Sequence, residues 1–174
     1  MTNYFELYEV PVSFHPDLDI IKKKYFDLTR LHHPDRYAAG SAAESEDALQ
    51  KTALVNEGFK TLRSKMALTA HILKLNGLLE DEEKYSLPPA FLMEVMDVNE
   101  LIDDLAPGDA AALRHAEAAL NDLEADIDQA TDKLTQSYSP ITGDTELLLR
   151  IKDFHFRKKY LLRIKERIGK FAAR

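Results

Sequence analysis

Apolar residues recur every three or four positions through most of the 174-residue chain, and Val, Ile and Thr nowhere cluster in alternating runs. This spacing is the period of amphipathic helices and differs from the two-residue period of strands. The sequence therefore predicts an all-α protein. We expect helices at residues 4–8, from 18 to a proline at 34, from about 48 to 64, and at 65–75, 90–105, 109–137 and 145–171.

Residues that cap or break helices set these expected boundaries. Asp17 is a good N-cap for the second helix, and Pro34 ends it because proline lacks a backbone donor and disfavours helical geometry at the residue before it. The small, polar stretch 38–47 predicts a continuation of the loop after Pro34. Gly77 ends the fourth helix, and Asp144 is the expected cap of the last one.

Each helix of a folded bundle buries one apolar stripe. The stripes predicted for the second, third and last helices are Leu18, Ile21, Tyr25 and Leu28; Val55, Phe59 and Leu62; and Leu147, Ile151, Phe154 and Leu161.

A break in the pattern separates two parts of the chain. Residues 77–89 contain a glycine, the acidic run 80–83 and a Pro-Pro pair, a combination typical of a linker. We expect an N-terminal domain at residues 1–76 that contains an antiparallel helical hairpin. We expect a C-terminal domain at 90–174, where three helices with short connections favour an antiparallel three-helix bundle.

The composition is that of a globular chain, with 45% hydrophobic and 30% charged residues and a net charge of −7. The charge is uneven: residues 77–149 hold 3 basic and 18 acidic side chains, whereas residues 150–174 hold 10 and 2. The basic C-terminal segment could bind phosphates, but the acidic segment beside it opposes that. Nucleic acid is therefore not an expected partner.

Several chemistries are excluded or disfavoured. The sequence contains no cysteine, which excludes disulfides, thiolate zinc sites and cysteine ligation of an iron–sulfur cluster. The histidines other than His33 lack the spacing of metal ligands, so we expect neither a metal nor a cofactor. They are His15, His32, His71, His115 and His155. No apolar run is long enough to cross a membrane, and the start lacks the pattern of a secretion signal. We therefore expect a cytoplasmic protein that does not contact a membrane.

The tripeptide His33-Pro34-Asp35 stands between two predicted antiparallel helices. The helix before it carries basic residues that point away from the apolar stripe, at Lys22, Lys23 and Arg30. An ordinary solvated helix face would also explain these cations. A catalytic pair of His33 and Asp35 is disfavoured, because residues two apart in a loop are poorly placed to orient one another and no nucleophile accompanies them.

This arrangement resembles the J-domain family, and the segment VNEGFKTL is similar to that family's third helix. The resemblance implies that Lys22, Lys23 and Arg30 dock on an acidic surface of a heat-shock chaperone. It also implies that His33, Pro34 and Asp35 promote ATP hydrolysis by that chaperone, so that this chain regulates a partner ATPase and is not itself an enzyme. Arg36 stands where the family usually has lysine.

The helix predicted at 90–105 is apolar on two faces. One stripe is the expected core, comprising Phe91, Val95, Val98, Ile102 and Leu105. Leu92, Met93 and Met96 lie on the opposite side, which a helix with one buried face does not need. Either the rest of the protein covers this second face or it is an exposed binding patch. Methionine suits an adaptable contact surface, which favours the patch.

The segment FLMEVMDVNELIDDL resembles the first helix of the C-terminal domain of the HscB family, and GSAAES and TLRSKMALTAHILKLNG are similar to that family as well. The resemblance implies a co-chaperone that binds an IscU-type iron–sulfur scaffold and delivers it to an HscA-type chaperone during iron–sulfur cluster assembly or transfer. The implied scaffold-binding residues are Leu92, Met93, Met96, Asp97, Glu100, Asp104 and Phe156. Met96 and Asp97 stand where leucine and glutamate are expected.

Two alternatives to this interpretation stay open at the level of sequence. The chain could be a J-domain co-chaperone of another heat-shock chaperone with another client. It could also be a helical interaction protein whose His-Pro-Asp loop is incidental, in which case no ATPase would respond to it.

Overall fold

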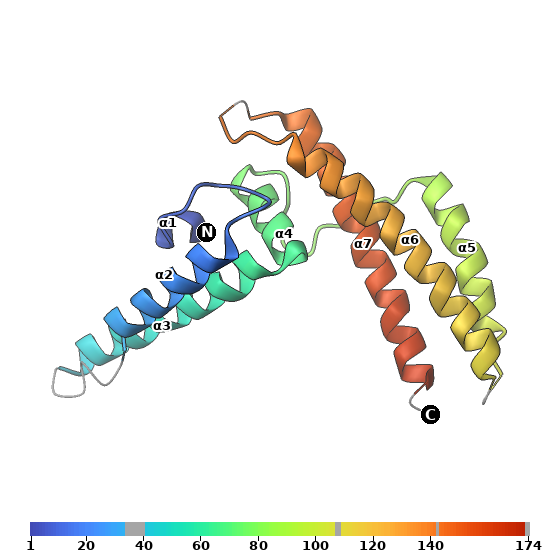
Figure 1. The fold of residues 1–174 in the computed structure, drawn as a ribbon, viewed down its shortest axis with the longest axis horizontal. Helices are drawn as coiled ribbons and strands as arrows, with labels where there is room; N and C mark the ends of the chain where they lie inside the picture. Colours follow the sequence, from blue (N-terminus) through green and yellow to red (C-terminus); the bar gives the residue numbers. More distant parts are fainter. Residues whose placement is uncertain (34–40, 107–108, 142, 173–174) are drawn as a thin grey trace. The chain divides into compact units, whose positions relative to one another are not determined.

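The structure is a computed structural model that describes residues 1–33, 41–106, 109–141 and 143–172. These residues form seven helices and no strand (Figure 1), which confirms the all-α prediction. The helices are α1 (Tyr4–Leu7), α2 (Leu18–Leu31), α3 (Ala42–Arg63), α4 (Lys65–Leu75), α5 (Pro89–Asp103), α6 (Ala110–Gln136) and α7 (Thr145–Ala172).

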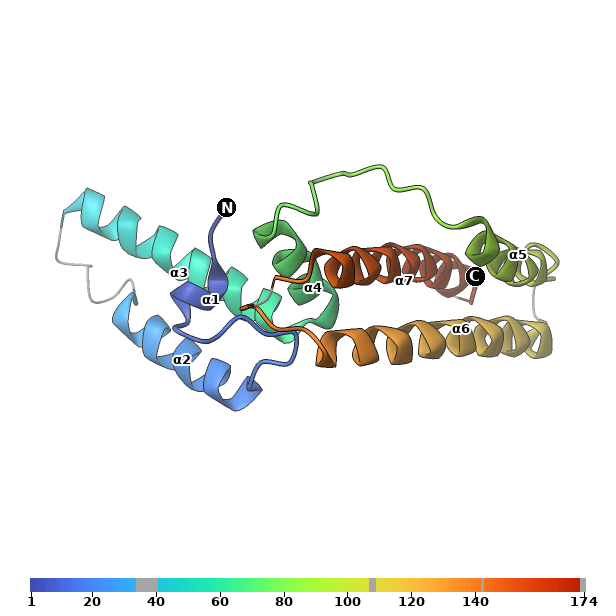
Figure 2. The same ribbon diagram turned by 90° about the horizontal axis from the view of Figure 1, so that it is seen from above.

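The chain divides into two compact units. Unit 1 comprises Met1–Leu79 and Tyr138–Gly143, and unit 2 comprises Glu80–Ser137 and Asp144–Arg174. Within unit 1, α2 and α3 lie side by side as an antiparallel hairpin, and within unit 2, α6 and α7 do the same (Figures 1 and 2). Each unit is therefore built around one long helical hairpin.

The start of α2 has the expected cap but not the full expected stripe. The Asp17 side chain accepts hydrogen bonds from the backbone N–H of Asp19 at 2.9 Å and of Ile20 at 3.1 Å. Ile21 is fully buried, whereas Leu18 is 53% exposed, so its assignment to the core was wrong. At 100° per residue, Leu18 lies roughly 50° from the middle of the stripe that contains Ile21.

The start of α3 differs from the prediction of a loop over residues 38–47, because α3 begins at Ala42. Ser41 and Glu44 form a capping box. The Ser41 backbone N–H donates to a Glu44 carboxylate oxygen at 2.7 Å, and the Ser41 hydroxyl accepts from the Glu44 backbone N–H at 3.3 Å. These reciprocal bonds satisfy donors at the helix start, and the alanines that follow Ser41 have high helix propensity.

Unit 1 packs α1 against α3 at Gly58. The Tyr8 ring is fully buried, and its hydroxyl donates to the Val55 carbonyl at 2.7 Å. A Cβ atom on Gly58 would lie 2.9 Å from the Tyr8 ring and 3.1 Å from the Tyr4 ring. The absence of a side chain at this position is therefore what lets α1 approach α3 so closely.

Unit 2 has a mostly aliphatic core. The stripe predicted for α5 is buried as expected, and it packs with residues of α6 and α7 such as Leu120, Ile127 and Leu161. On α7, Leu148 and His155 are buried, whereas the predicted Leu147 and Phe154 are only partly buried. Ile151 and Leu161 are buried as predicted, so the buried stripe of α7 differs from the predicted one only in part.

The chain before α5 is held on α7 although it is not helical. The Tyr85 hydroxyl donates to an Asp153 carboxylate oxygen at 2.9 Å, and Lys152 and Glu83 form an ion pair at 2.5 Å. The Tyr85 ring stacks on Phe156 with ring centroids 4.3 Å apart. Part of the segment expected to be a linker is thus a packed strap of unit 2.

Candidate partner-binding sites

The exposed side of α2 carries a set of side chains that we call the cationic face, consisting of Lys22, Lys23, Phe26 and Arg30. All four are exposed, as expected for the three cations. Lys22 and Lys23 have no carboxylate partner among the residues that the structure describes. The neighbouring Lys24 points elsewhere and is ion-paired with Glu9. Lys22 and Lys23 therefore present positive charge that the described part of unit 1 does not neutralise.

Phe26 is the member of this face that the sequence analysis missed. It is 55% exposed although it lies in the middle of a 14-residue helix. Its spacing from Lys22 and Arg30, four residues each way, already places it on their side of the helix. An exposed phenylalanine among cations supplies an apolar contact that charges alone cannot give.

The end of α2 positions the first residue of the His-Pro-Asp motif. The His32 backbone N–H donates to the Leu28 carbonyl at 3.0 Å, and the His32 carbonyl accepts from the Thr52 hydroxyl of α3 at 3.0 Å. His33 follows directly, is exposed, and lines a shallow cavity of about 410 Å³ together with Phe26 and Arg30. His33 and the cationic face are therefore continuous. Pro34 and Asp35 lie outside the described residues.

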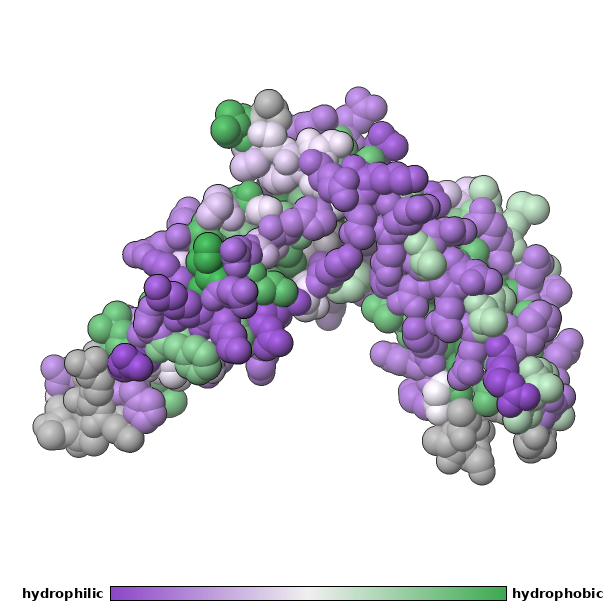
Figure 3. All heavy atoms as spheres, in the orientation of Figure 1, coloured by the Kyte–Doolittle hydropathy of each residue, from purple (hydrophilic) through white to green (hydrophobic). Residues whose placement is uncertain are grey.

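The outer side of α5 carries the second exposed surface. Leu92, Met93 and Met96 are 42%, 71% and 57% exposed, and we call them the apolar patch. The bundle does not cover this face, so the three residues are not part of the core of unit 2. In the orientation of Figure 1, hydrophilic side chains occupy most of the visible surface (Figure 3).

Acidic residues border the apolar patch. Asp97, Glu100 and Asp104 are exposed and have no ion-pair partner among the described residues. Their neighbour Asp103 differs, because Arg167 binds its carboxylate at 2.8 Å. The three carboxylates that the family resemblance assigned to partner binding therefore form no ion pair within the described part of unit 2.

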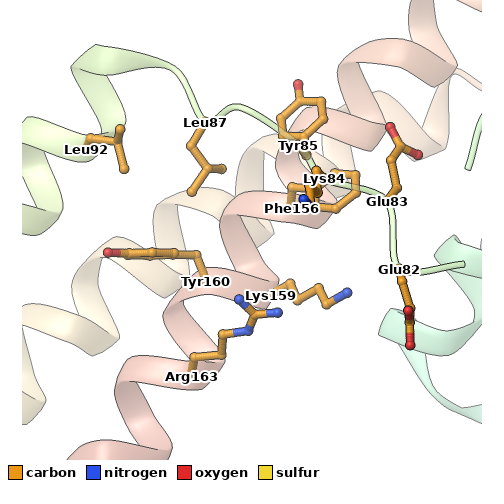
Figure 4. Close-up of a pocket in the computed structure, with 10 residues that line it drawn as sticks. All are labelled: Glu82, Glu83, Lys84, Tyr85, Leu87, Leu92, Phe156, Lys159, Tyr160 and Arg163. Atoms are coloured by element: carbon orange, nitrogen blue, oxygen red, sulfur yellow. The ribbon is translucent and has the colours of Figure 1, made fainter. Parts of the chain in front are cut away.

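Phe156 is not on this exposed surface. It is only 9% exposed because Tyr85 covers its ring, so its role in scaffold binding stays a prediction. Burial and the bond to Asp153 raise the pKa of Tyr85 to about 12, so the strap keeps its hydroxyl proton. Phe156 nevertheless lines a cleft of about 640 Å³ that Leu92 also lines (Figure 4). The cleft connects the two residues, although only Leu92 belongs to the patch.

Two histidines, His71 and His155, are buried within the protein. The His71 Nε2 accepts from the Tyr4 backbone N–H at 3.2 Å, and burial lowers the pKa of His71. Burial lowers the pKa of His155 to about 4. Within the described ranges, no group of His, Cys, Asp and Glu side chains could hold a metal ion, and no helix is long and apolar enough to cross a membrane.

The structure is thus a helical protein with two exposed surfaces of different chemistry. Comparisons with known proteins specify the class further. The family described as the HSCB C-terminal oligomerisation domain matches residues 87–169. A protein named co-chaperone protein HscB homolog from Pseudoalteromonas atlantica is 33% identical over 169 residues, which are 94% of this chain and 96% of that protein. The chain belongs to the HscB family of co-chaperones.

Further relatives agree with this assignment. An HscB homolog from Shewanella loihica is 32% identical over 82% of this chain and 73% of its own length. The crystal structure of human co-chaperone protein HscB matches with a TM-score of 0.79 and 26% identity over 97% of this chain and 81% of that chain. The structure of chaperone HscB from Vibrio cholerae matches in fold, with a TM-score of 0.67 and 23% identity over 97% and 96% of the two chains.

Proposed function

We propose that this chain stimulates ATP hydrolysis by an HscA-type heat-shock chaperone and delivers an IscU-type scaffold to it during iron–sulfur cluster assembly or transfer. The observation that carries the proposal is the presence of two exposed helix surfaces, one cationic and next to His33, the other apolar and bordered by unpaired carboxylates. In this function the chain acts as a cytoplasmic regulator of a partner ATPase and needs no cofactor of its own.

The chaperone-binding site would be the cationic face with the His-Pro-Asp motif. Lys22, Lys23 and Arg30 attract an acidic surface of the chaperone and orient the encounter. His33, Pro34 and Asp35 then contact the chaperone directly: the proline restricts the loop, and the imidazole and carboxylate make directional hydrogen bonds. Residues 1–76 form the J-domain that presents this site.

The scaffold-binding site would be the apolar patch with its acidic border. Leu92, Met93 and Met96 lose exposed apolar area on binding, which stabilises the complex by about 25 cal/mol for each Å² removed from water. Asp97, Glu100 and Asp104 pair with cations of the scaffold. Phe156 supports this site from the cleft. Residues 90–174 form the scaffold-binding domain, and residues 77–89 connect it to the J-domain.

Joining the two sites in one chain supplies the mechanism. A scaffold held on unit 2 is brought to the chaperone that unit 1 engages, so its local concentration there rises by tethering. The His-Pro-Asp motif couples the arrival of that client to ATP hydrolysis. The scaffold, not this cysteine-free chain, supplies the cluster ligands.

Steady-state ATP hydrolysis by an HscA-type chaperone tests this function. We expect the chain to stimulate hydrolysis, an IscU-type scaffold to amplify the stimulation, and His33→Gln to abolish it while leaving scaffold affinity unchanged. His15→Gln, at another exposed histidine of unit 1, is the matched control and should stimulate fully. Equal stimulation by His33→Gln, or none by the unmodified chain, would contradict the proposal.

A further inference from the structure

The cations of α7 divide into paired and unpaired groups. Most of them bind carboxylates of unit 2, in the pairs Lys152–Glu83, Arg157–Asp153, Lys158–Glu124, Lys165–Glu124 and Arg167–Asp103. Lys159 and Arg163, four residues apart, are exposed and have no carboxylate partner within the described part of the chain. Arg150 and Lys170 of α7 are likewise exposed and unpaired in the described part of the chain, but of these four cations only Lys159 and Arg163 line the cleft.

Both cations line the cleft that Leu92 and Phe156 share. Figure 4 shows Lys159 and Arg163 along α7 beneath the strap, with the Tyr160 ring on the side towards Leu92. The Lys159 ammonium lies 5.8 Å from the centroid of the Phe156 ring. The cleft therefore combines aromatic surface with positive charge.

The carboxylates at the cleft do not cancel this charge. Glu83 is already bound by Lys152 at 2.5 Å, and that interaction lowers the pKa of Glu83. Glu82 lies at the end of the cleft opposite to Leu92 in Figure 4. In Figure 4 the side chains of Lys159 and Arg163 lie in the middle of the cleft, whereas Leu87 and Tyr160 lie nearest to Leu92. On the other side of Leu92, the α5 surface carries the unpaired Asp97 and Glu100.

We propose that the scaffold-binding surface continues past Leu92 into this cleft, which receives an acidic segment of the same partner with an apolar side chain beside the acid. The inference rests on the proposed function and deepens it. The apolar side chain packs against Tyr160 and the Tyr85–Phe156 stack, and the carboxylate pairs with Arg163, whose planar guanidinium can bind it in a bidentate manner.

Continuity and charge both favour this occupant. Leu92 belongs to the apolar patch and to the cleft, so a partner seated on the patch already reaches the cleft mouth. Opposite charges on the two sides of Leu92 allow a partner with a basic and an acidic segment to bind in one orientation and disfavour the reverse. The cleft therefore acts as the determinant of orientation.

Scaffold affinity of charge variants in the full-length chain tests the proposal, measured by titration calorimetry with a purified IscU-type scaffold. Arg163→Glu should raise the Kd about tenfold, and Arg163→Met, which keeps the apolar stem, about threefold. Arg150→Glu is the matched control, since Arg150 is exposed on the same helix, makes the same change in net charge and does not line the cleft. It should change the Kd less than twofold.

Failure of this inference is distinguishable from failure of the proposed function. If Arg163→Glu binds like Arg150→Glu while Met93→Ala weakens binding, the cleft is not part of the scaffold site and only the extension is overturned. If the unmodified chain does not bind the scaffold at all, the proposed function and the inference both fall. Circular dichroism and thermal unfolding check that Arg163→Glu remains folded, which its exposure leads us to expect.

Discussion

The cationic face of α2 and the apolar patch of α5 are both exposed helix surfaces, but they suit different kinds of contact. The cationic face offers charge around one aromatic ring, which favours fast, salt-sensitive association. The apolar patch offers surface that gains free energy on leaving water, which favours slow dissociation. Under the proposed function, this difference suits α2 to a transient regulatory contact and α5 to holding a client.

Removing the apolar patch should have the largest effect on partner binding. The combined variant Leu92→Ala, Met93→Ala and Met96→Ala should raise the scaffold Kd about 100-fold, because truncating contact residues at an interface commonly costs about 1 kcal/mol or more each. Chaperone stimulation without scaffold should not change. Leu149→Ala on α7, which is 48% exposed, is the matched control and should bind normally. Unchanged scaffold affinity in the combined variant would contradict the proposal that α5 holds the client.

The two units should also differ in the effect of a glycine-to-alanine substitution on stability, because Gly58 of unit 1 is closely packed. Gly58→Ala should destabilise unit 1 by about 2 kcal/mol, because the added methyl group overpacks a buried, hydrogen-bonded tyrosine. Gly169→Ala in α7 is the control, since nothing lies within 4 Å of its added Cβ, and it should be neutral or stabilise by up to about 1 kcal/mol. Urea unfolding of both variants checks this, and equal effects would contradict the packing described for unit 1.

Acidification should weaken unit 2 through His155. Its folded-state pKa of about 4 is below the ordinary value of 6.5, so the unfolded chain binds the proton more readily. Stability is therefore full above pH 6.5 and falls as the pH drops towards 4, by about 2 kcal/mol at pH 5. His155→Gln should flatten this dependence in thermal unfolding. A lowered pKa of His71 gives unit 1 a dependence of the same sign. A dependence unaltered by His155→Gln would show that other groups cause it.

The affinities of the two surfaces should also differ in their dependence on salt, by a smaller factor. Raising the ionic strength from about 0.05 to 0.3 M should weaken chaperone binding about tenfold, because screening acts on the exposed cations of α2. Scaffold binding should weaken only about threefold, since the apolar patch is insensitive to screening and only the charged groups beside it respond. Parallel titrations with both partners measure this. Equal salt dependence would mean that the two contacts do not differ in character.

Local signals in the sequence predicted the helices well. Asp17 and Asp144 cap the helices that they were expected to cap, and Gly77 follows α4 with a positive φ of 68°. The capping box at Ser41 is also local, but the small polar residues around it resemble a loop. Such errors concern one or two turns because capping and loop formation compete within a few residues.

Contacts distant in sequence limited the prediction of the sites. The helical period placed Leu92, Met93 and Met96 opposite the core stripe of their helix but left open whether the rest of the protein covers them. The burial of Phe156 could not be predicted from the helical period, because it depends on Tyr85, whose hydroxyl partner on α7 lies 68 residues away along the chain. The unpaired state of Arg163 is likewise visible only when the partners of the other α7 cations are known. Periodicity shows which side a residue faces, not what covers it.

The most direct test of the two-site mechanism is complementation between full-length variants. His33→Gln retains the patch, and the combined Leu92→Ala, Met93→Ala and Met96→Ala variant retains the motif. ATP hydrolysis by the HscA-type chaperone is measured with scaffold and an equimolar mixture of the two variants, with both kept monomeric as checked by sedimentation. If one chain must hold both sites, the mixture gives no more stimulation than the combined variant alone. Recovery of full scaffold-amplified stimulation by the mixture would contradict delivery by tethering.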